Sequence, residues 1–183
     1  MSKVAIKGAD TGTGVFTLES PATNTDRTLV LPDEAGTIDT LQRAGNVLQV
    51  VQAETEATVA TTSTSFVTTT LTASITPSSA SNKVLVLVSA AGLNGVALSA
   101  GIYTLFRGTT AGTDLGGASN YGFNLVYANN SVIGGAISIN YLDSPSTTSS
   151  QTYTFAMRSA VGQSISMNSN AQKSTITLME IAA

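Results

Sequence analysis

Residues 66–75 read FVTTTLTASI and residues 83–88 read KVLVLV, and these two stretches decide the fold. In the first, apolar residues at Val67, Leu71 and Ile75 alternate with hydroxyl residues, which is the pattern of a strand with one buried and one solvated face. The second stretch is apolar at every position after its lysine, which indicates a strand covered on both faces. Both segments are therefore expected to be β-strands.

The same kind of strand pattern continues on both sides of this pair. Further strands are expected at residues 46–52, 102–106, 123–127, 137–141, 153–157, 164–167 and 175–181. The segments between them are rich in glycine, asparagine, serine and proline, which favour turns, and no helical apolar period persists. We predict an all-β fold: an antiparallel β-sandwich, most simply a jelly roll, preceded by an extended β-rich N-terminal segment.

The last predicted strand carries apolar side chains on both faces. Ile176 and Leu178 share one face, and Met179 and Ile181 share the other. One face can line the core, and the other is expected to meet a neighbouring subunit. The sequence thus predicts a homo-oligomer, with interface residues expected in the two strands that are apolar on both faces. These residues are Val86, Val88, Met179 and Ile181.

Composition excludes much of enzyme chemistry. The chain has no cysteine and no histidine, so it lacks a thiolate nucleophile, a zinc–thiolate site and the commonest general base near pH 7. Only 10% of the residues are charged, whereas serine and threonine occupy 50 of the 183 positions. The expected surface is polar without being charged, and we predict that the protein is not an enzyme and holds no cofactor or metal.

The net charge of −3 argues against a nucleic-acid partner, because such a partner requires a basic patch. No segment approaches the ~20 consecutive apolar residues of a membrane helix, so no membrane insertion is expected. The N-terminus lacks the apolar stretch of a secretory signal, which predicts synthesis in a cytoplasm.

The charged residues divide the chain. Residues 1–56 hold 12 of the 19 charged positions, although they make up less than a third of the chain. We place a boundary at the turn-favouring pair Gly45–Asn46, with an N-terminal segment of residues 1–45 and a C-terminal domain of residues 46–183. The N-terminal segment has too few large apolar residues for a core of its own and is expected to depend on a partner.

Several motifs could carry chemistry, but each has a simpler structural interpretation. A glycosidase would require two carboxylates about 5–9.5 Å apart, and the C-terminal domain offers only Asp114, Asp143 and Glu180. The two aspartates lie in turn sequences, where they are expected to cap local backbone. Glu180 is expected to be solvated or paired with a cation.

Three other features are weaker still. Residues 11–14 (TGTG) match no phosphate-binding motif and are expected to form a turn. Asp33, Glu34 and Asp39 offer oxygen ligands, but their spacing fits no calcium loop. Tyr121 and Tyr127 lie near loop ends, where a tyrosine could stack on a sugar ring, although a place in the core or an interface is favoured.

Two segments near the N-terminus resemble a known family. Residues 16–22 (FTLESPA) and 27–37 (RTLVLPDEAGT) are similar to a segment that recurs in fibre proteins of tailed bacteriophages. The later residues 47–52, 75–86 and 174–181 resemble a head domain of phage fibres and capsid decorations. That head domain is thought to be a trimeric jelly roll of the tumour-necrosis-factor and C1q class.

The resemblance implies a structural component of a virion. It would be an intertwined homotrimeric surface fibre of the tail or head, with an N-terminal anchor to other virion proteins and a C-terminal knob. A host surface glycan is a candidate partner of the knob. The implied attachment residues are Phe16, Leu18, Pro21, Leu29, Leu31, Pro32 and Gly36. A capsid decoration or cement protein is the alternative, and a carbohydrate-binding module or glycan depolymerase is more remote.

Overall fold

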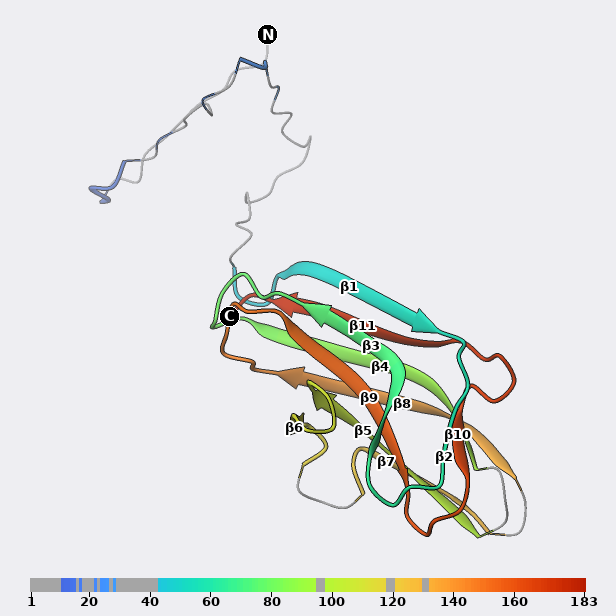
Figure 1. The fold of residues 1–183 in the computed structure, drawn as a ribbon. Coiled ribbons are helices and arrows are strands. Elements are labelled where there is room, and N and C mark those ends of the chain that lie inside the picture. The colour runs from blue at the N-terminus through green and yellow to red at the C-terminus, as the bar shows by residue number, and fades with distance from the viewer. Residues whose placement is uncertain are drawn as a thin grey trace. The chain divides into compact units, whose positions relative to one another are not determined.

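The computed structural model describes residues 11–15, 17, 22, 24–26, 28, 43–94, 98–117, 121–129 and 132–183. The chain divides into two units, Met1–Thr37 and Ile38–Ala183. All of the regular structure in the described residues is β-strand, and it lies in the second unit (Figure 1). The predicted boundary at Gly45–Asn46 lies just before the first strand and remains a prediction.

The strands form two antiparallel sheets. The first sheet contains β1 (Val47–Thr55), β2 (Val59–Thr61), β4 (Lys83–Asn94), β8 (Ile133–Asp143), β10 (Ile165–Met167) and β11 (Ser174–Ile181). The second contains β3 (Val67–Ile75), β5 (Ser99–Arg107), β6 (Thr113–Asp114), β7 (Asn124–Ala128) and β9 (Gln151–Ser159). The predicted all-β, antiparallel, sandwich-like fold is confirmed.

The order of the long strands is β1-β11-β4-β8 in the first sheet and β3-β9-β5-β7 in the second. The short strands β10 and β2 extend the first sheet, since β10 pairs with β4 beyond the end of β11 and β2 pairs with β10. The short β6 pairs with the end of β5. The last strand, β11, is flanked by β1 and β4 and so lies inside the first sheet.

The core fills the space between the sheets. Its largest fully buried side chains are Tyr103, Tyr153, Phe155, Leu71, Leu105, Ile137, Ile139, Met157, Ile165, Met167 and Ile176. Burying one aliphatic or aromatic side chain of this size stabilises a fold by about 1.5–3 kcal/mol, so the hydrophobic effect holds the sheets together. Ring contacts add to it, because Tyr103 and Phe155 stack with their centroids 5.9 Å apart.

The predicted strands agree with the structure in position but not in length. The apolar run at residues 83–88 is only the first half of β4, which continues to Asn94. The sequence did not predict β2 and β6, which have three and two residues and so are too short for an alternating pattern.

Within the described part of the chain, only one face of the apolar strand β4 is covered. Val84, Val86 and Val88 point into the core and are at most 2% exposed, whereas Leu85 and Leu87 point outward and are half-buried. Val86 and Val88 therefore have no surface to offer a neighbouring subunit, and the predicted interface positions in this strand must be corrected. The outward residues of the same strand are Leu85 and Leu87.

Candidate functional site: an apolar face on the first sheet

A row of apolar side chains crosses the outer face of the first sheet. Val50 of β1 lies opposite Met179 of β11, Met179 lies opposite Leu85 of β4, and Leu85 lies opposite Leu142 of β8. Directly opposite residues of antiparallel strands share a face, so these four side chains form one continuous row. Val50 is 56% exposed and Leu142 is 48% exposed, so the row is open to solvent.

Neighbouring residues widen this row into a patch. Val47 lies opposite Ile181 on one side of the row, and Leu87 follows Leu85 on the other. We call the set of Val47, Val50, Leu85, Leu87, Leu142, Met179 and Ile181 the outer apolar patch. Apolar side chains gathered in this way typically mark a contact surface.

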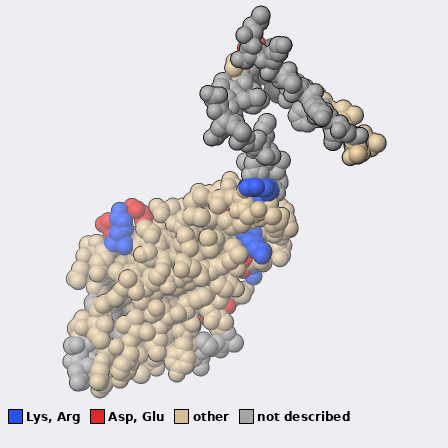
Figure 2. Space-filling model, turned by 180° about the vertical axis from the view of Figure 1, so that it is seen from behind, with Lys and Arg blue, Asp and Glu red and all other residues tan. Residues whose placement is uncertain are grey.

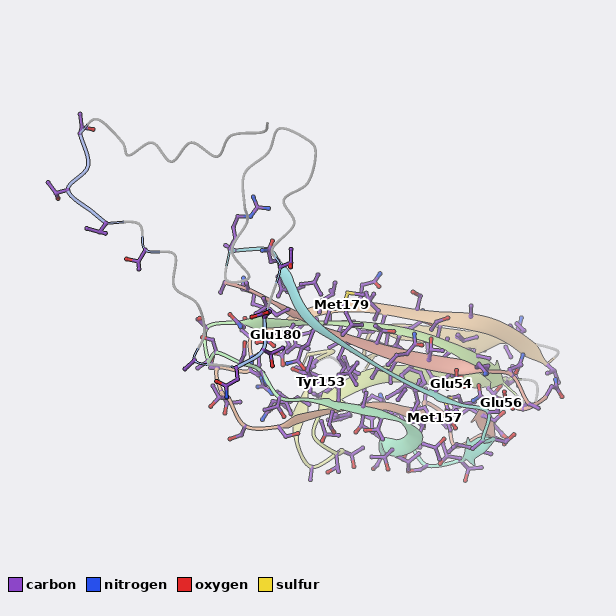
Figure 3. All side chains as sticks on the ribbon, turned by 90° about the horizontal axis from the view of Figure 1, so that it is seen from above. Glu54, Glu56, Tyr153, Met157, Met179 and Glu180 are labelled. Carbon is purple, nitrogen blue, oxygen red and sulfur yellow. The ribbon has the colours of Figure 1, made fainter. Side chains whose placement is uncertain are left out.

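Polar residues border the patch. Beyond Leu87, the next row of the same face runs through Glu54, Thr175, Ser89 and Ser138. Lys173 makes exposed ion pairs with Glu54 at 2.9 Å and Glu56 at 3.6 Å, which raise the pKa of the lysine. Figure 3 shows Glu54 and Glu56 at one end of β1 and Glu180 near the other. An apolar centre with a polar rim is typical of protein interfaces.

The sequence identified only part of this patch. Met179 and Ile181 point outward and are half-buried, while their neighbours Ile176 and Leu178 are fully buried, as the predicted face assignment requires. Whether Met179 and Ile181 contact a second subunit remains a prediction. Leu85 was missed because residues 84–88 are apolar at every position and do not reveal which face turns outward. Val50 and Leu142 were missed because their place in the row depends on the strand register.

A buried carboxylate lies beside the patch but faces the other way. Glu180 is 1% exposed and accepts hydrogen bonds from the side-chain amide of Gln49 at 2.6 Å and that of Asn82 at 2.6 Å. The Ser78 backbone N–H at 2.6 Å and its hydroxyl at 2.8 Å donate to Oε1 of Glu180, the oxygen that also accepts from Asn82, whereas Gln49 donates to Oε2. Burial alone raises the pKa of Glu180, but these donors outweigh it and lower the pKa to about 2.

The Glu180 cluster corrects one expectation and indicates a structural role. The carboxylate is neither solvated nor paired with a cation, because neutral donors satisfy it. Those donors come from β1 and from the loop between β3 and β4, so Glu180 fixes this loop to the end of β11. No substrate can reach a carboxylate that is 1% exposed.

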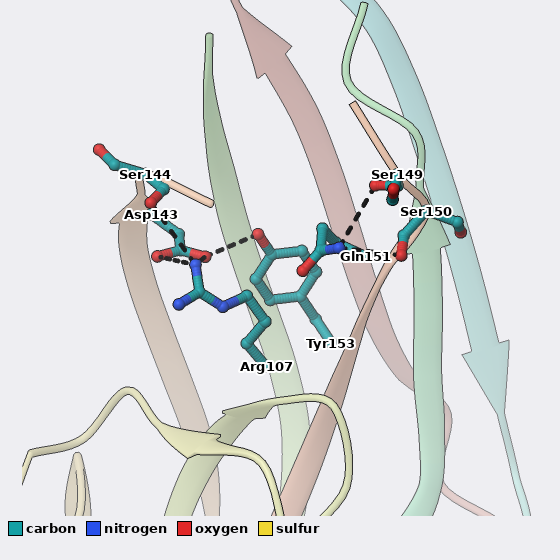
Figure 4. Close-up of polar contacts among 7 residues, drawn as sticks. All are labelled: Arg107, Asp143, Ser144, Ser149, Ser150, Gln151 and Tyr153. Atoms are coloured by element: carbon teal, nitrogen blue, oxygen red, sulfur yellow. Dashed lines mark hydrogen bonds and ion pairs between the residues drawn. The ribbon is translucent and has the colours of Figure 1, made fainter. Parts of the chain in front are cut away.

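A second buried cluster joins the two sheets. Asp143 of β8 forms an ion pair with Arg107 of β5 at 3.0 Å and accepts a hydrogen bond from the Tyr153 hydroxyl of β9 at 2.8 Å (Figure 4). Burial, followed by the hydrogen bond to Asp143, strongly raises the pKa of Tyr153. The expectation that Asp143 caps a local turn was therefore wrong, because its partners lie on the opposite sheet.

The third carboxylate behaves as predicted. Asp114 accepts a hydrogen bond from the backbone N–H of Gly116 at 2.9 Å, which is a local cap, and another from the Thr104 hydroxyl at 2.7 Å. These bonds dock the loop after β6 onto β5. Each of the three carboxylates considered for catalysis is thus engaged with different structural partners.

Hydroxyl groups cover the edge of the outer face of the second sheet. Thr68, Thr70, Thr72 and Ser74 all point outward from β3. Ser74 and Thr152 share a hydrogen bond at 2.7 Å, and Thr72 and Thr154 share one at 3.2 Å. On the face drawn in Figure 2, most of the described surface is neither acidic nor basic, and the Lys, Arg, Asp and Glu side chains lie in small clusters.

The two loop tyrosines are solvent-exposed, so a place in the core is wrong, whereas the alternative place in an interface remains a prediction. Tyr121 is 61% exposed and Tyr127 is 54% exposed. Tyr127 and the exposed Leu125 are two residues apart on β7 and therefore share a face. That face points outward from the second sheet, where Tyr127 lies opposite Ala100 of β5.

The predicted attachment residues and the considered calcium ligands, Asp33, Glu34 and Asp39, lie outside the described residues. Within the described ranges, no group of three or more acidic side chains could hold a metal ion. The same ranges contain no helix of the length and hydrophobicity needed to cross a membrane.

No protein-family model matches this chain, and no curated protein is significantly similar to it.

Proposed function

We propose that this chain is a structural component of a bacteriophage virion: a homotrimeric surface fibre with an N-terminal anchor and a C-terminal knob that contacts the host surface. The proposal combines the resemblance of residues 16–37 to phage fibre proteins with two properties of the C-terminal domain. One is its strand order, and the other is its outer apolar patch. Neither property involves catalysis, and the protein is proposed not to be an enzyme.

The strand order supports a jelly roll. The first long strand, β1, lies beside the last, β11, and six of the seven connections between successive long strands cross from one sheet to the other. Eight long strands arranged as β1-β11-β4-β8 and β3-β9-β5-β7 fit the two Greek keys of that fold. Jelly rolls occur in viral capsid proteins and in lectins, among others, so the fold is compatible with the function but does not define it.

The outer apolar patch is the observation that carries the proposal. It places apolar side chains from four adjacent strands on one open face of a domain whose core is already complete. A second copy of the chain is the simplest partner for such a face, because every copy carries the same patch. The resemblance makes the closed assembly a trimer, in which each subunit buries this face against its neighbours.

The proposed polarity follows from the two parts of the chain. All described core residues lie within residues 71–182, so the C-terminal domain has a core of its own. The N-terminal segment would attach to other virion proteins, and the weakly charged, hydroxyl-rich domain would face outward. A neutral host glycan suits such a surface, because no described basic patch is available to bind an anionic one.

Purified virions provide the direct test of location. Mass spectrometry of particles should detect this chain, and antibodies against residues 46–183 should label them. Labelling of the tail or of isolated head projections would support a fibre, whereas uniform labelling of the head would favour the decoration alternative. Absence from particles would reject the virion proposal altogether.

A shortened chain tests the polarity. A chain that starts at Asn46 should remain folded and self-associated but should fail to bind particles that lack the protein. The full chain is the matched control and should bind them. If both chains bound equally well, attachment would belong to the C-terminal domain and the proposed polarity would be reversed.

A further inference from the structure

The edges of the two sheets differ in how they are protected from other strands. An edge strand offers unpaired backbone N–H and C=O groups, and soluble proteins commonly protect such edges with charges, irregular register, short length or a cover. Four long strands lie at the sheet edges, namely β1, β3, β7 and β8. Three of them carry at least one of these protections.

The edges formed by β1 and β3 are protected in several ways. Both strands have an irregular register, at Val47–Gln49 and at Thr68–Thr72 respectively. Side chains also bridge the two edges, because Gln49 donates to the Thr76 carbonyl at 2.7 Å, and the Thr55 and Thr70 hydroxyls lie 3.1 Å apart. On the remaining side of the sandwich, β7 is the shortest of the eight strands in the two orders above, with five residues, so the edge that it offers is short.

Among the described residues, nothing gives the strand β8 any of these protections along most of its length. It spans 11 residues, Ile133–Asp143, and keeps regular register with β4 throughout. Its sequence IGGAISINYLD contains no proline, and its single charge, Asp143, points inward to Arg107. At about 3.3 Å per residue, the strand offers an edge of about 36 Å.

The N-terminal half of β8 is the most accessible part of this edge. Residues 133–136 are all exposed, and a Cβ atom added to Gly135 would meet no described atom within 4 Å. Nearer its other end, β8 packs against the second sheet. There the rings of Phe123 and Tyr141 make an edge-to-face contact with their centroids 5.6 Å apart. The accessible half is also distinct from the outer apolar patch, which reaches β8 only at Leu142.

We propose that β8 pairs through this free edge with β8 of a second copy, antiparallel and about a twofold axis. A twofold contact requires a strand that is complementary to itself. In an antiparallel pair, Asp143 of each strand lies toward the Ile133 end of the other, so like charges do not meet. The small residues Gly134, Gly135 and Ala136 allow the second strand to approach closely, and the first sheets of the two copies become one continuous sheet.

This proposal rests on the trimer of the proposed function, because the β8 contact would join two such trimers. Light scattering of the full chain is then expected to give six times the chain mass of 18.6 kDa. Ala136→Lys places a charge at the exposed edge and should halve the measured mass to that of three chains. Thr68→Lys, on the outward face of the protected edge β3, is the matched control and should leave six chains. Circular dichroism should show that both variants remain folded.

The possible masses separate this proposal from the trimer. A wild-type mass of three chains, or six chains in Ala136→Lys, would overturn the pairing of β8 and leave the trimer intact. A wild-type mass of two chains that falls to one in Ala136→Lys would support the β8 pairing and reject the trimer. A wild-type mass of one chain would reject both.

Discussion

The hydroxyl of Tyr153 donates a 2.8 Å hydrogen bond to the carboxylate of Asp143, and this bond links the two sheets. Tyr153 is fully buried in β9 of the second sheet, and Asp143 ends β8 of the first. Because Asp143 also pairs with Arg107, the charge inside the sandwich is compensated. The cluster thereby fixes how the end of β8 lies against the second sheet.

Tyr153→Phe should destabilise the domain. The substitution removes a hydrogen bond to a buried charged group, which typically contributes about 1.5–3 kcal/mol to the free energy of unfolding. Urea denaturation would measure the loss. Tyr141→Phe is the control, because no described hydrogen bond involves its hydroxyl, and a change below about 0.5 kcal/mol is expected. Equal effects of the two substitutions would contradict the assigned role of Asp143.

Tyr103→Phe should have the opposite outcome to Tyr153→Phe. The Tyr103 hydroxyl is buried, and no hydrogen-bond partner for it lies among the described residues, while burial raises its pKa to about 12. Removing an unsatisfied polar atom costs little, so stability in the same urea experiment should be unchanged or higher. A loss of more than about 1 kcal/mol would show that the hydroxyl has a partner in solution.

Gly92→Ala should be destabilising because of the same tyrosine. An added Cβ would lie 2.8 Å from the Tyr103 hydroxyl oxygen and 3.1 Å from Cγ1 of Ile137. Such overpacking of a core typically costs about 1–3 kcal/mol. Combining it with Tyr103→Phe should recover part of the loss, since the closest atom is then absent. A double variant as unstable as Gly92→Ala alone would contradict this packing.

Acid should weaken the domain through Glu180. Its pKa is about 2 in the folded chain and near 4.5 when unfolded, so the carboxylate stabilises the fold fully above pH 4.5. Below that pH the unfolded chain binds the proton first, and stability should fall by about 3 kcal/mol down to pH 2. Denaturation curves recorded across this pH window would measure the decline.

Glu180→Gln tests whether that pH dependence belongs to this residue. The variant should be less stable than the wild type at pH 7, and its stability should change much less between pH 4.5 and 2. Glu54→Gln is the control, since its ion pair with Lys173 is exposed and contributes little. An undiminished acid dependence in Glu180→Gln would assign the effect to other carboxyl groups.

The sequence predicted the fold class because alternation reports burial directly. In β3, Leu71, Ala73 and Ile75 are core residues, and the intervening Thr72 and Ser74 point outward, as the period-two pattern requires. The outer apolar patch was harder to predict. Its row Val50–Met179–Leu85–Leu142 depends on the register of four strands that are far apart in sequence.

The buried polar clusters depend on tertiary contacts even more strongly. Asp143 stands in a turn-like sequence, and its partners Arg107 and Tyr153 come from other strands. Glu180 follows an apolar run, and the residues near it in the sequence do not predict that Gln49, Ser78 and Asn82 will be its hydrogen-bond donors. Local patterns predict strands, but they do not predict which strands become neighbours.

Light scattering of the purified full chain and of Met179→Lys at micromolar concentration tests the central claim most directly. The wild type should have a mass that is a multiple of three chains of 18.6 kDa, and Met179→Lys should remain folded with a mass of no more than two chains. Met179 points outward, so a lysine there should disturb self-association without disturbing the core. A well-folded wild-type monomer, or an unchanged assembly in Met179→Lys, would contradict the proposal that the outer apolar patch joins the subunits.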